Sequence, residues 1–403
     1  MQIAVVDTTL MRPPWGGCQT FLVNLTRSVS ALGVEVHVVT APGPANAIAR
    51  RIESLGGTVH LDLWPSRSLP EDRAEFLATW VATRGIAVYI LSVSADVGWL
   101  TLPLLPARVA TIAVVQADSR SFYDPLRHYA AFVDRAVGVS AETRRRIVAS
   151  CGLPEARATR IPYGVERLSR GEAEARWGDP PPSGPLRVGY VGRLEHDQKR
   201  VLDLPVVADE LARRAVSLRL DVVGDGADRE GLKRRLETAG LKESVRFWGW
   251  LPPDEVGRRL RELDVLVLFS DFEGLPAALL EAMGHAVVPV VTDIASGHRD
   301  VVRSGTNGFL VDVGDIGGFV AAIERLDRDR GLLQRMRRAA WEGTQELSSE
   351  AMAEAYLSII EQIRSEPETA RAPRPPGPFP LMPSCRSRYP RWLRRLRWRI
   401  ATG

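Results

Sequence analysis

The stretch VLVLFSDFEGLPAALLEAMGHAVVPVVT, residues 265–292, decides the fold of this chain. Its first residues, 265–269, are apolar throughout, which predicts a parallel strand buried on both faces. After a short turn, Pro276 suits the first position of a helix, and the helix formers 277–283 end at a glycine. A second apolar run, 286–291, predicts the next strand. The order strand, turn, helix, strand predicts an α/β fold built on a parallel sheet.

The turn before this predicted helix has the chemistry of an anion site. Free N–H groups and the helix dipole point at a ligand above the turn, so Gly274, Leu275 and Pro276 are candidate contacts for a diphosphate. Glu273 lies in the turn and Glu281 in the second turn of the helix. Carboxylates bind phosphate poorly but accept hydrogen bonds from hydroxyl groups. The stretch therefore predicts a nucleotide-sugar site, with Glu273 on the hexose and Glu281 on the ribose.

Length and composition favour a globular protein of more than one domain. The 403 residues suffice for two domains and a tail, and 45% hydrophobic and 25% charged residues are typical of soluble proteins. The three cysteines (Cys18, Cys151 and Cys385) show neither metal-ligand spacing nor an evident disulfide set, as in proteins of a reducing compartment. We recognise no signal peptide or membrane-spanning run, so we expect a cytoplasmic protein.

The C-terminal tail carries much of the positive charge. The net charge is +4, but residues 371–403 contain nine arginines and no acidic residue, so the rest of the chain is mildly acidic and is not expected to bind nucleic acid. Residues 366–390 are proline-rich and predict no fold of their own. The segment RWLRRLRWRI, residues 391–400, is either a disordered basic tail or a short interfacial helix with weak affinity for the inner face of an anionic membrane.

The first part of the chain predicts a βαβ unit of its own. It contains a strand at Gln2–Asp7, a helix at 18–32 and a strand at 36–40. Gly16 and Gly17 precede the helix, where backbone can approach a ligand closely, or where a tight turn simply requires glycine. The dinucleotide fingerprint G-x-G-x-x-G is absent.

Further elements follow in both parts. Strands are predicted at 58–61, 87–92, 109–116, 136–140, 186–191, 217–223 and 245–247, and helices at 50–55, 76–84, 142–150, 228–239, 317–326, 332–346 and 350–363. A hairpin-like return is predicted at 306–311. Residues 169–185, charged and then rich in proline and glycine, predict a linker between domains at 1–168 and 186–345.

These motifs resemble the retaining glycosyltransferases of family 4, the glycosyl transferases group 1, over about residues 1–364. The resemblance rests on Glu-Gly-Leu-Pro ending in Glu281 and on the segment GRLEHDQK at 192–199, with support from the Gly16-Gly17 loop, Val139-Ser140 and Pro162-Tyr163-Gly164-Val165. It implies the GT-B fold, in which two Rossmann-like, doubly wound domains face a central cleft. It also implies that the final helix, at 346–365, crosses back to the first domain, with Met352, Tyr356, Ile359 and Ile360 as its apolar stripe.

The resemblance assigns further roles at the donor site. Arg193 and Lys199 would hold the donor diphosphate, Arg as a planar fork of donors and Lys as a point charge, although both could also be ordinary loop charges. Backbone around Trp250 and Leu251 would hold the base. The implied reaction moves a hexose from a nucleotide diphosphate sugar to an acceptor hydroxyl with retention of configuration. Glu273 would orient the hexose and not act as a nucleophile.

The sequence departs from the family at one position. Many relatives carry a histidine at the end of the strand predicted here at 109–116, near the transferred sugar, and this chain has Gln116 and Asp118 instead. Gln116 can bond a sugar hydroxyl but cannot titrate. Asp118 can do either, or can cap the following turn. Both are candidate contacts for the sugar or the acceptor.

We expect no cofactor besides the nucleotide-sugar co-substrate, and no obligatory metal. The one Asp-x-Asp, Asp327-Arg328-Asp329, lies between two predicted helices far from the phosphate unit, as a solvated helix junction would. The expected acceptor is a sugar, a lipid-linked molecule or a small molecule. The alternative is a catalytically silent nucleotide-sugar-binding protein of the same fold. A nucleotide-sugar epimerase or a phosphorylase of this fold is a further interpretation, and no local feature of the sequence favours it.

Overall fold

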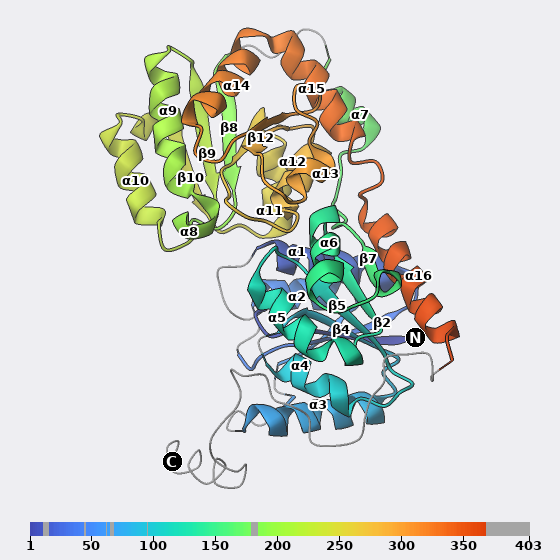
Figure 1. The fold of residues 1–403 in the computed structure, drawn as a ribbon. Helices are drawn as coiled ribbons and strands as arrows, with labels where there is room; N and C mark the ends of the chain where they lie inside the picture. The colour runs from blue at the N-terminus through green and yellow to red at the C-terminus, as the bar shows by residue number, and fades with distance from the viewer. Residues whose placement is uncertain are drawn as a thin grey trace, which may run out of the picture.

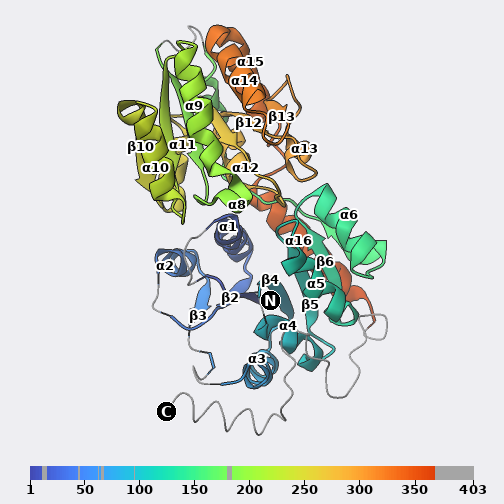
Figure 2. The same ribbon diagram turned by 60° about the vertical axis from the view of Figure 1, so that its left-hand side comes forward.

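A computed structural model of the chain describes residues 1–10, 16–43, 46–61, 63–64, 68–94, 96–178 and 184–367 (Figure 1). The structure has two halves, each a parallel β-sheet flanked by helices. In Figure 2 helix α8 (His196–Lys199) of the second half lies above helix α1 (Gly17–Ala31) of the first half, where the two halves meet. This arrangement confirms the predicted α/β architecture of two doubly wound units.

The first sheet has seven strands in the order β3-β2-β1-β4-β5-β6-β7, and every neighbouring pair is parallel. The strands are β1 (Gln2–Asp7), β2 (Glu35–Val39), β3 (Thr58–His60), β4 (Val88–Val93), β5 (Ala110–Val115), β6 (Arg135–Gly138) and β7 (Ala158–Arg160). The other helices of this half are α2 (Ala47–Ser54), α3 (Pro70–Arg84), α4 (Val97–Thr101), α5 (Arg120–Tyr129) and α6 (Ala141–Ser150), with 3₁₀ turns η1 (Leu102–Leu104), η2 (Ala130–Phe132) and η3 (Glu155–Arg157).

Both faces of the first sheet are buried, because side chains alternate along each strand. Along β1, Ile3 and Val5 join the core that includes residues of α1 and α2. Ala4 and Val6 join a second core that includes residues of α3, α4 and α5. The apolar run at the start of the chain is therefore explained by a central strand with helices on each side.

The second sheet has six strands in the order β10-β9-β8-β11-β12-β13, again all parallel. The strands are β8 (Leu186–Val191), β9 (Leu218–Val223), β10 (Val245–Gly249), β11 (Val265–Leu268), β12 (Val288–Thr292) and β13 (Phe309–Val311). Around them lie α7 (Arg170–Glu174), α9 (Leu204–Arg213), α10 (Arg229–Thr238), α11 (Pro253–Leu260), α12 (Ala277–Gly284), α13 (His298–Val301), α14 (Ile316–Arg328) and α15 (Arg330–Glu342), with 3₁₀ turns η4 (Val201–Asp203) and η5 (Lys242–Ser244).

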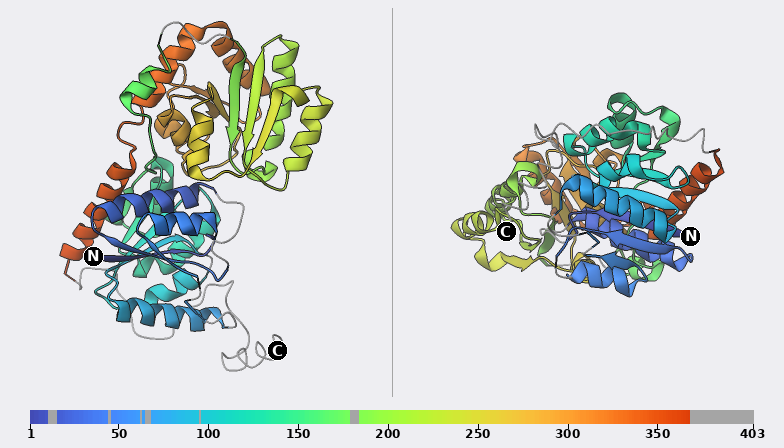
Figure 3. Two further views of the ribbon diagram at one scale, coloured as in Figure 1. Left: turned by 180° about the vertical axis from the view of Figure 1, so that it is seen from behind. Right: turned by 90° about the horizontal axis from the view of Figure 1, so that it is seen from below.

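The last described helix, α16 (Ser349–Ser365), returns to the first half and packs against α1 (Figure 3). Its four predicted stripe residues are all buried: Met352, Tyr356, Ile359 and Ile360. The ring of Tyr356 lies 5.9 Å from that of Phe21 on α1, centroid to centroid. The predicted crossing helix is confirmed.

Three local predictions differ from the structure. Pro276 is the N-cap of α12 with an extended backbone, one residue before the helix begins. The return predicted at 306–311 is a tight turn that leads into β13, and β13 runs parallel to β12 because the intervening chain crosses over through α13. The predicted linker begins with the short helix α7, which contacts α15, and the domain limits at 168 and 186 stay a prediction.

Residues 368–403, including the candidate interfacial helix at 391–400, lie outside the described residues. Within the described part of the chain, no helix is both long enough and apolar enough to cross a membrane.

Candidate functional site

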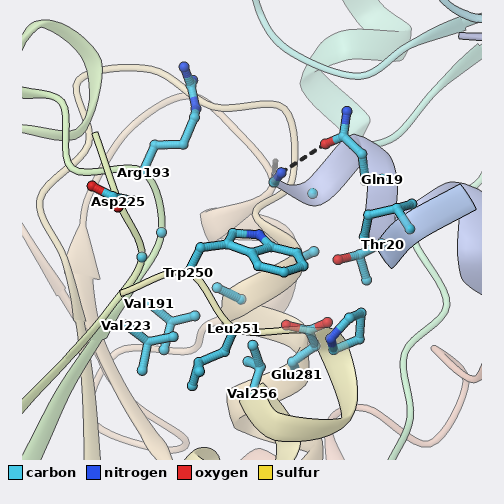
Figure 4. Close-up of a pocket in the computed structure, with 18 residues that line it drawn as sticks. Gln19, Thr20, Val191, Arg193, Val223, Asp225, Trp250, Leu251, Val256 and Glu281 are labelled. Carbon is cyan, nitrogen blue, oxygen red and sulfur yellow. Dashed lines mark hydrogen bonds between the residues drawn. The ribbon is translucent and has the colours of Figure 1, made fainter. Parts of the chain in front are cut away.

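A cleft lies between the two halves (Figure 4). It forms at the carboxyl ends of parallel strands, where α/β sheets place their ligand sites. Its lining comes from the start of α1, from α2, from the ends of β8 and β9, and from the segments around α11 and α12: Gly16, Gly17, Gln19, Thr20, Ile48, Val191, Gly192, Arg193, Val223, Gly224, Asp225, Trp250, Leu251, Pro253, Val256, Ala277, Ala278 and Glu281. Six predicted site residues thus share one cleft: Gly16, Gly17, Arg193, Trp250, Leu251 and Glu281.

The N-terminus of α12 opens into this cleft through Ala277 and Ala278. The first N–H groups of a helix have no acceptor within the helix, and the helix dipole makes that end attractive to anions. Gly17 packs against the same end, because a Cβ on Gly17 would lie 3.4 Å from the Cβ of Ala277. The Gly16–Gly17 loop and the start of α12 are therefore neighbours at the cleft.

The loop before α1 is held by a residue that the sequence analysis did not single out. Gln19 accepts a hydrogen bond at its Oε1 from the backbone N–H of Gly16 over 2.8 Å, and both residues line the cleft. A glutamine three residues after a helix cap is the signal of a capping box, and it could have been read from the sequence. Thr20 follows on the next position of α1 and also faces the cleft.

Part of the cleft lining is apolar. Trp250, Leu251 and Val256 line it from the second half, and Ile48 lines it from α2 in the first half. Figure 4 shows the indole of Trp250 across the middle of the cleft, with Arg193 and Asp225 on one side and Glu281 on the other. A flat aromatic side chain among aliphatic ones can stack on a nucleobase.

Glu281 faces this cleft without a protein partner. Its carboxylate has no hydrogen bond or ion pair to any described residue, and burial raises its pKa to about 7. A carboxylate in this setting gains from any hydroxyl that can donate to it. The predicted contact with a ribose fits this arrangement.

Glu273, in the turn before α12, is buried and paired. Lys199 Nζ and Ser270 Oγ both donate to its Oε1, the latter over 2.7 Å. Burial alone would raise its pKa, but the Lys199 charge and these hydrogen bonds hold the pKa below its usual value. The carboxylate is therefore ionised at neutral pH, and its Oε2, which has no hydrogen bond to any described residue, remains available as an acceptor.

Arg193 lines the cleft just after β8. Its guanidinium donates to Glu195 Oε2 and to Gln198 Oε1, each over 2.5 Å. Gln198 also donates from Nε2 to the carbonyl of Phe272 over 3.0 Å. Arg193 is thereby connected through Gln198 to the turn that carries Glu273.

The turn residues Gly274, Leu275 and Pro276 do not line the cleft. A Cβ on Gly274 would lie 2.2 Å from the carbonyl oxygen of Gln116, so glycine lets the two halves touch there. Leu275 is buried and packs against Gly297. These residues shape the junction between the halves, and their predicted contact with a diphosphate stays a prediction.

Gln116 and Asp118 are occupied within the first half. The amide of Gln116 is buried, donating to Ser92 Oγ over 2.6 Å and accepting from Tyr163 Oη over 2.9 Å. Asp118 accepts from Tyr123 Oη over 2.9 Å and pairs with Arg146 at 3.2 Å. Neither side chain lines the cleft, and the sugar or acceptor contact suggested for them stays a prediction.

A buried histidine near Glu273 was also missed. His298 donates from Nδ1 to the carbonyl of Thr292 over 2.7 Å, and the preceding Gly297 donates from its backbone N–H to Gly274 O over 2.8 Å. Burial lowers the pKa of His298, so the imidazole is neutral. No sequence motif marks it, because its place beside the turn depends on the packing of α13.

The Asp-x-Asp at 327–329 lies at the junction of α14 and α15. Asp327 pairs with Arg330, and Asp329 caps α15 by accepting from the Leu332 N–H over 2.7 Å. Over the described ranges of the chain, no group of three or more His, Cys, Asp and Glu side chains could hold a metal ion.

Comparison with known families adds to this geometry. The model of Glycosyltransferase Family 4 matches residues 15–167, and the model of Glycosyl transferases group 1 matches residues 172–342. The chain belongs to the group 1 glycosyltransferases, with the GT-B fold. The two matches meet at the predicted linker and together cover both halves of the cleft.

Individual relatives match part of this glycosyltransferase. It is 38% identical over 152 residues to the lipopolysaccharide 1,6-galactosyltransferase of Salmonella typhimurium, covering 36% of this chain and 42% of that protein. It is 34% identical over 170 residues to the 2-deoxystreptamine glucosyltransferase of Streptomyces kanamyceticus, covering 42% of each. The chain thus spans less than half the length of these curated relatives.

Solved structures show the same fold over nearly the whole chain. HepE of Anabaena, solved in complex with UDP and glucose, superposes with a TM-score of 0.74 at 16% identity, covering 90% of this chain and 100% of that chain. At this identity the likeness establishes the fold alone.

Proposed function

We propose that the protein transfers a hexose from a nucleotide diphosphate sugar to an acceptor hydroxyl. The observation that carries the proposal is the convergence of three groups on one cleft: the α12 N-terminus, Arg193 and the unpartnered carboxylate of Glu281. Each suits a different part of a nucleotide sugar. Glu273 lies four residues before the first residue of the same helix, and its ionised carboxylate would contact the donor sugar.

The donor would lie along the cleft from base to sugar. Trp250 and Leu251 would contact the base, and Glu281 would accept hydrogen bonds from the ribose hydroxyls. Arg193, Lys199 and the N–H groups at the start of α12 would hold the diphosphate. Uridine diphosphate is the first nucleotide to test, since HepE binds it in the same fold.

Transfer would proceed with retention and without a metal ion. The acceptor oxygen would attack the anomeric carbon on the face from which the phosphate leaves, forming the new C–O bond as the old one breaks. The departing phosphate oxygen would take the acceptor proton. Arg193, Lys199 and the α12 N-terminus would stabilise the negative charge on the leaving diphosphate, which is the role that a metal ion has in other enzymes. Glu273 Oε2 would orient a hexose hydroxyl.

The acceptor would enter from the first half, beside the Gly16–Gly17 loop. The relatives named above act on lipopolysaccharide and on 2-deoxystreptamine, so both a glycan or lipid-linked acceptor and a small polar molecule belong in the proposal. We also propose a cytoplasmic protein that reaches the inner face of the membrane weakly through residues 391–400.

The deciding experiment measures binding and turnover together. The purified chain is titrated with UDP-, GDP-, ADP- and dTDP-sugars by calorimetry, and then assayed for sugar transfer to a panel of glycan and aminocyclitol acceptors. We expect one nucleotide to bind, Arg193→Ala to weaken that binding, and Glu273→Ala to bind the donor but lose nearly all transfer. Wild-type turnover by Glu273→Ala would refute its role, and binding without any transfer would favour a catalytically silent protein.

A further inference from the structure

Gln116 lies in the middle of a buried chain of hydrogen bonds beneath the cleft. Its Nε2 donates to Ser92 Oγ over 2.6 Å, and its Oε1 accepts from Tyr163 Oη over 2.9 Å. Ser92 Oγ in turn donates to Asp7 Oδ2 over 3.3 Å. Each of the four residues is at most 4% exposed. The chain therefore links the ends of β1, β4 and β5 to the segment after β7, away from solvent.

The hydrogen bonds of this chain all run in one direction. Ser92 Oγ donates to the carboxyl group of Asp7, and the Ser92 oxygen accepts from the amide nitrogen of Gln116. That leaves Oε1 of Gln116 to accept from Tyr163. Burial raises the pKa of Tyr163 well above its usual value, so its O–H remains a donor. Burial also raises the pKa of Asp7, which the hydrogen bonds from Thr9 and Ser92 oppose.

One end of the chain reaches the Gly16–Gly17 loop. Asp7 Oδ1 accepts from Thr9 N over 2.9 Å and from Thr9 Oγ1 over 2.7 Å. Gln19 Nε2 lies 3.4 Å from Thr9 Oγ1, while its Oε1 holds the N–H of Gly16. An unbroken set of hydrogen bonds therefore connects Gln116 to the loop that lines the cleft in Figure 4.

The other end reaches the turn that carries Glu273. The carbonyl of Gln116 lies directly against Gly274, so closely that no Cβ would fit. Tyr163 Oη lies 3.5 Å from that same carbonyl, and its ring approaches Gly17. The chain thus touches the Gly16–Gly17 loop, which lines the cleft, and the Glu273–Gly274 turn, which leads into α12.

We propose that Gln116 is a positioning residue that fixes the positions of the Gly16–Gly17 loop and the Glu273–Gly274 turn relative to each other. The proposal rests on the proposed function, because a nucleotide sugar that contacts both segments requires them to keep fixed relative positions. Glutamine suits the position because its amide offers a donor nitrogen to Ser92 and an acceptor oxygen to Tyr163. Its part in the reaction comes through these segments and not from contact with the sugar.

A double-mutant cycle distinguishes a positioning role of Gln116 from direct contact with the substrate. Ser92 is buried and does not line the cleft, so Ser92→Ala breaks the chain without removing a substrate contact. We expect Gln116→Leu and Ser92→Ala each to lower kcat/KM for the donor about tenfold. The double variant should have a kcat/KM no lower than that of the less active single variant. The affinity for the free nucleoside diphosphate should stay unchanged, because Trp250, Leu251 and Glu281 are not part of the chain. Thr79→Ala, on the exposed face of α3, is the control.

The outcomes are distinct. If Ser92→Ala behaves as wild type while Gln116→Leu loses activity, Gln116 contacts the substrate directly and the inference is overturned. Fully additive losses overturn it as well. If Ser92→Ala does not fold, Tyr163→Phe removes the hydroxyl at the other end of the same chain and takes its place in the cycle. A wild-type protein that binds and turns over no nucleotide sugar would overturn the proposed function and this inference together, whereas the other failures leave the function standing.

Discussion

At the scale of single residues, the two carboxylates of one segment differ in their surroundings. Glu273 is held ionised by Lys199, which lies 74 positions away in the chain. Glu281 has no partner among the described residues, and burial raises its pKa to about 7. The pKa of each carboxylate is therefore set by the segments that pack around it and not by the residue type.

The raised pKa of Glu281 predicts a pH-dependent gain of stability in Glu281→Gln. Because the folded-state pKa lies above the unfolded one, the carboxylate lowers wild-type stability as the pH rises from the unfolded value through about 7, and glutamine has no such cost. We expect the variant to be more stable by about 1 kcal/mol at about pH 8 and equal to wild type at about pH 4. Urea unfolding at both pH values measures this. The exposed Glu237→Gln is the control, and an equal shift at both pH values would contradict the assignment.

Removal of Lys199 should change the pH dependence of transfer. Lys199→Met leaves Glu273 buried without its counter-charge, so its pKa should rise from below to above its usual range. Transfer that needs the ionised carboxylate should then fall as the pH is lowered towards neutrality, while wild type stays flat there. A pH–rate profile of the donor reaction checks this. Lys233→Met, on the exposed side of α10, is the control and should match wild type. A flat pH–rate profile for Lys199→Met would show that Lys199 does not control the ionisation of Glu273.

At the scale of elements, the turn before α12 packs closely against the first half. Gly274→Ala would place a Cβ 2.2 Å from the Gln116 carbonyl, and both partners are backbone, so neither can rotate away. We expect a loss of roughly 1–3 kcal/mol in stability and weaker donor binding, because the turn must move. Chemical unfolding and calorimetry measure the two effects. Gly171→Ala is the matched control, since a Cβ there meets nothing within 4 Å; comparable losses in both variants would disprove the contact.

At the scale of the whole molecule, the C-terminal helix joins the halves. The second half also holds the first through Asp300, which accepts from the Ala141 N–H over 2.8 Å and pairs with Arg160 at 3.2 Å. α16 then packs on α1, whose N-terminus lines the cleft. Helix α16 therefore supports helix α1 and, through it, the cleft.

Tyr356 provides a test of this support. Tyr356→Ala removes a fully buried ring from between α16 and α1 and should cost about 3–5 kcal/mol of stability, with weaker donor binding. Tyr356→Phe should be nearly neutral, because the Tyr356 hydroxyl is buried with no hydrogen-bond partner among the described residues. Thermal unfolding of both variants distinguishes ring packing from a hydroxyl contact. A large loss in the Phe variant would show that the hydroxyl has a partner.

Much of the fold and part of the site could be predicted from the sequence. The apolar runs that form β8 and β11 and the turn and helix formers of α12 act over a few residues, so their pattern is local. Gly16, Gly17, Arg193, Trp250, Leu251 and Glu281 were named from motifs at strand ends, and those ends meet at one edge of each sheet. The hydrogen-bond partners of Gln116 could not be predicted, because they come from distant segments, and no motif marked His298.

The sequence by itself determined the alternation of strands and helices, the parallel sheets and the strand ends that carry the site, since hydrophobic periodicity and turn chemistry need only neighbouring residues. Only the tertiary structure decided that Lys199 pairs with Glu273, that the Glu281 carboxylate has no partner among the described residues, and that the Gln116 amide bonds Ser92 and Tyr163. Burial and the distance between charges depend on how the two halves meet, and that contact joins residues that no local pattern relates.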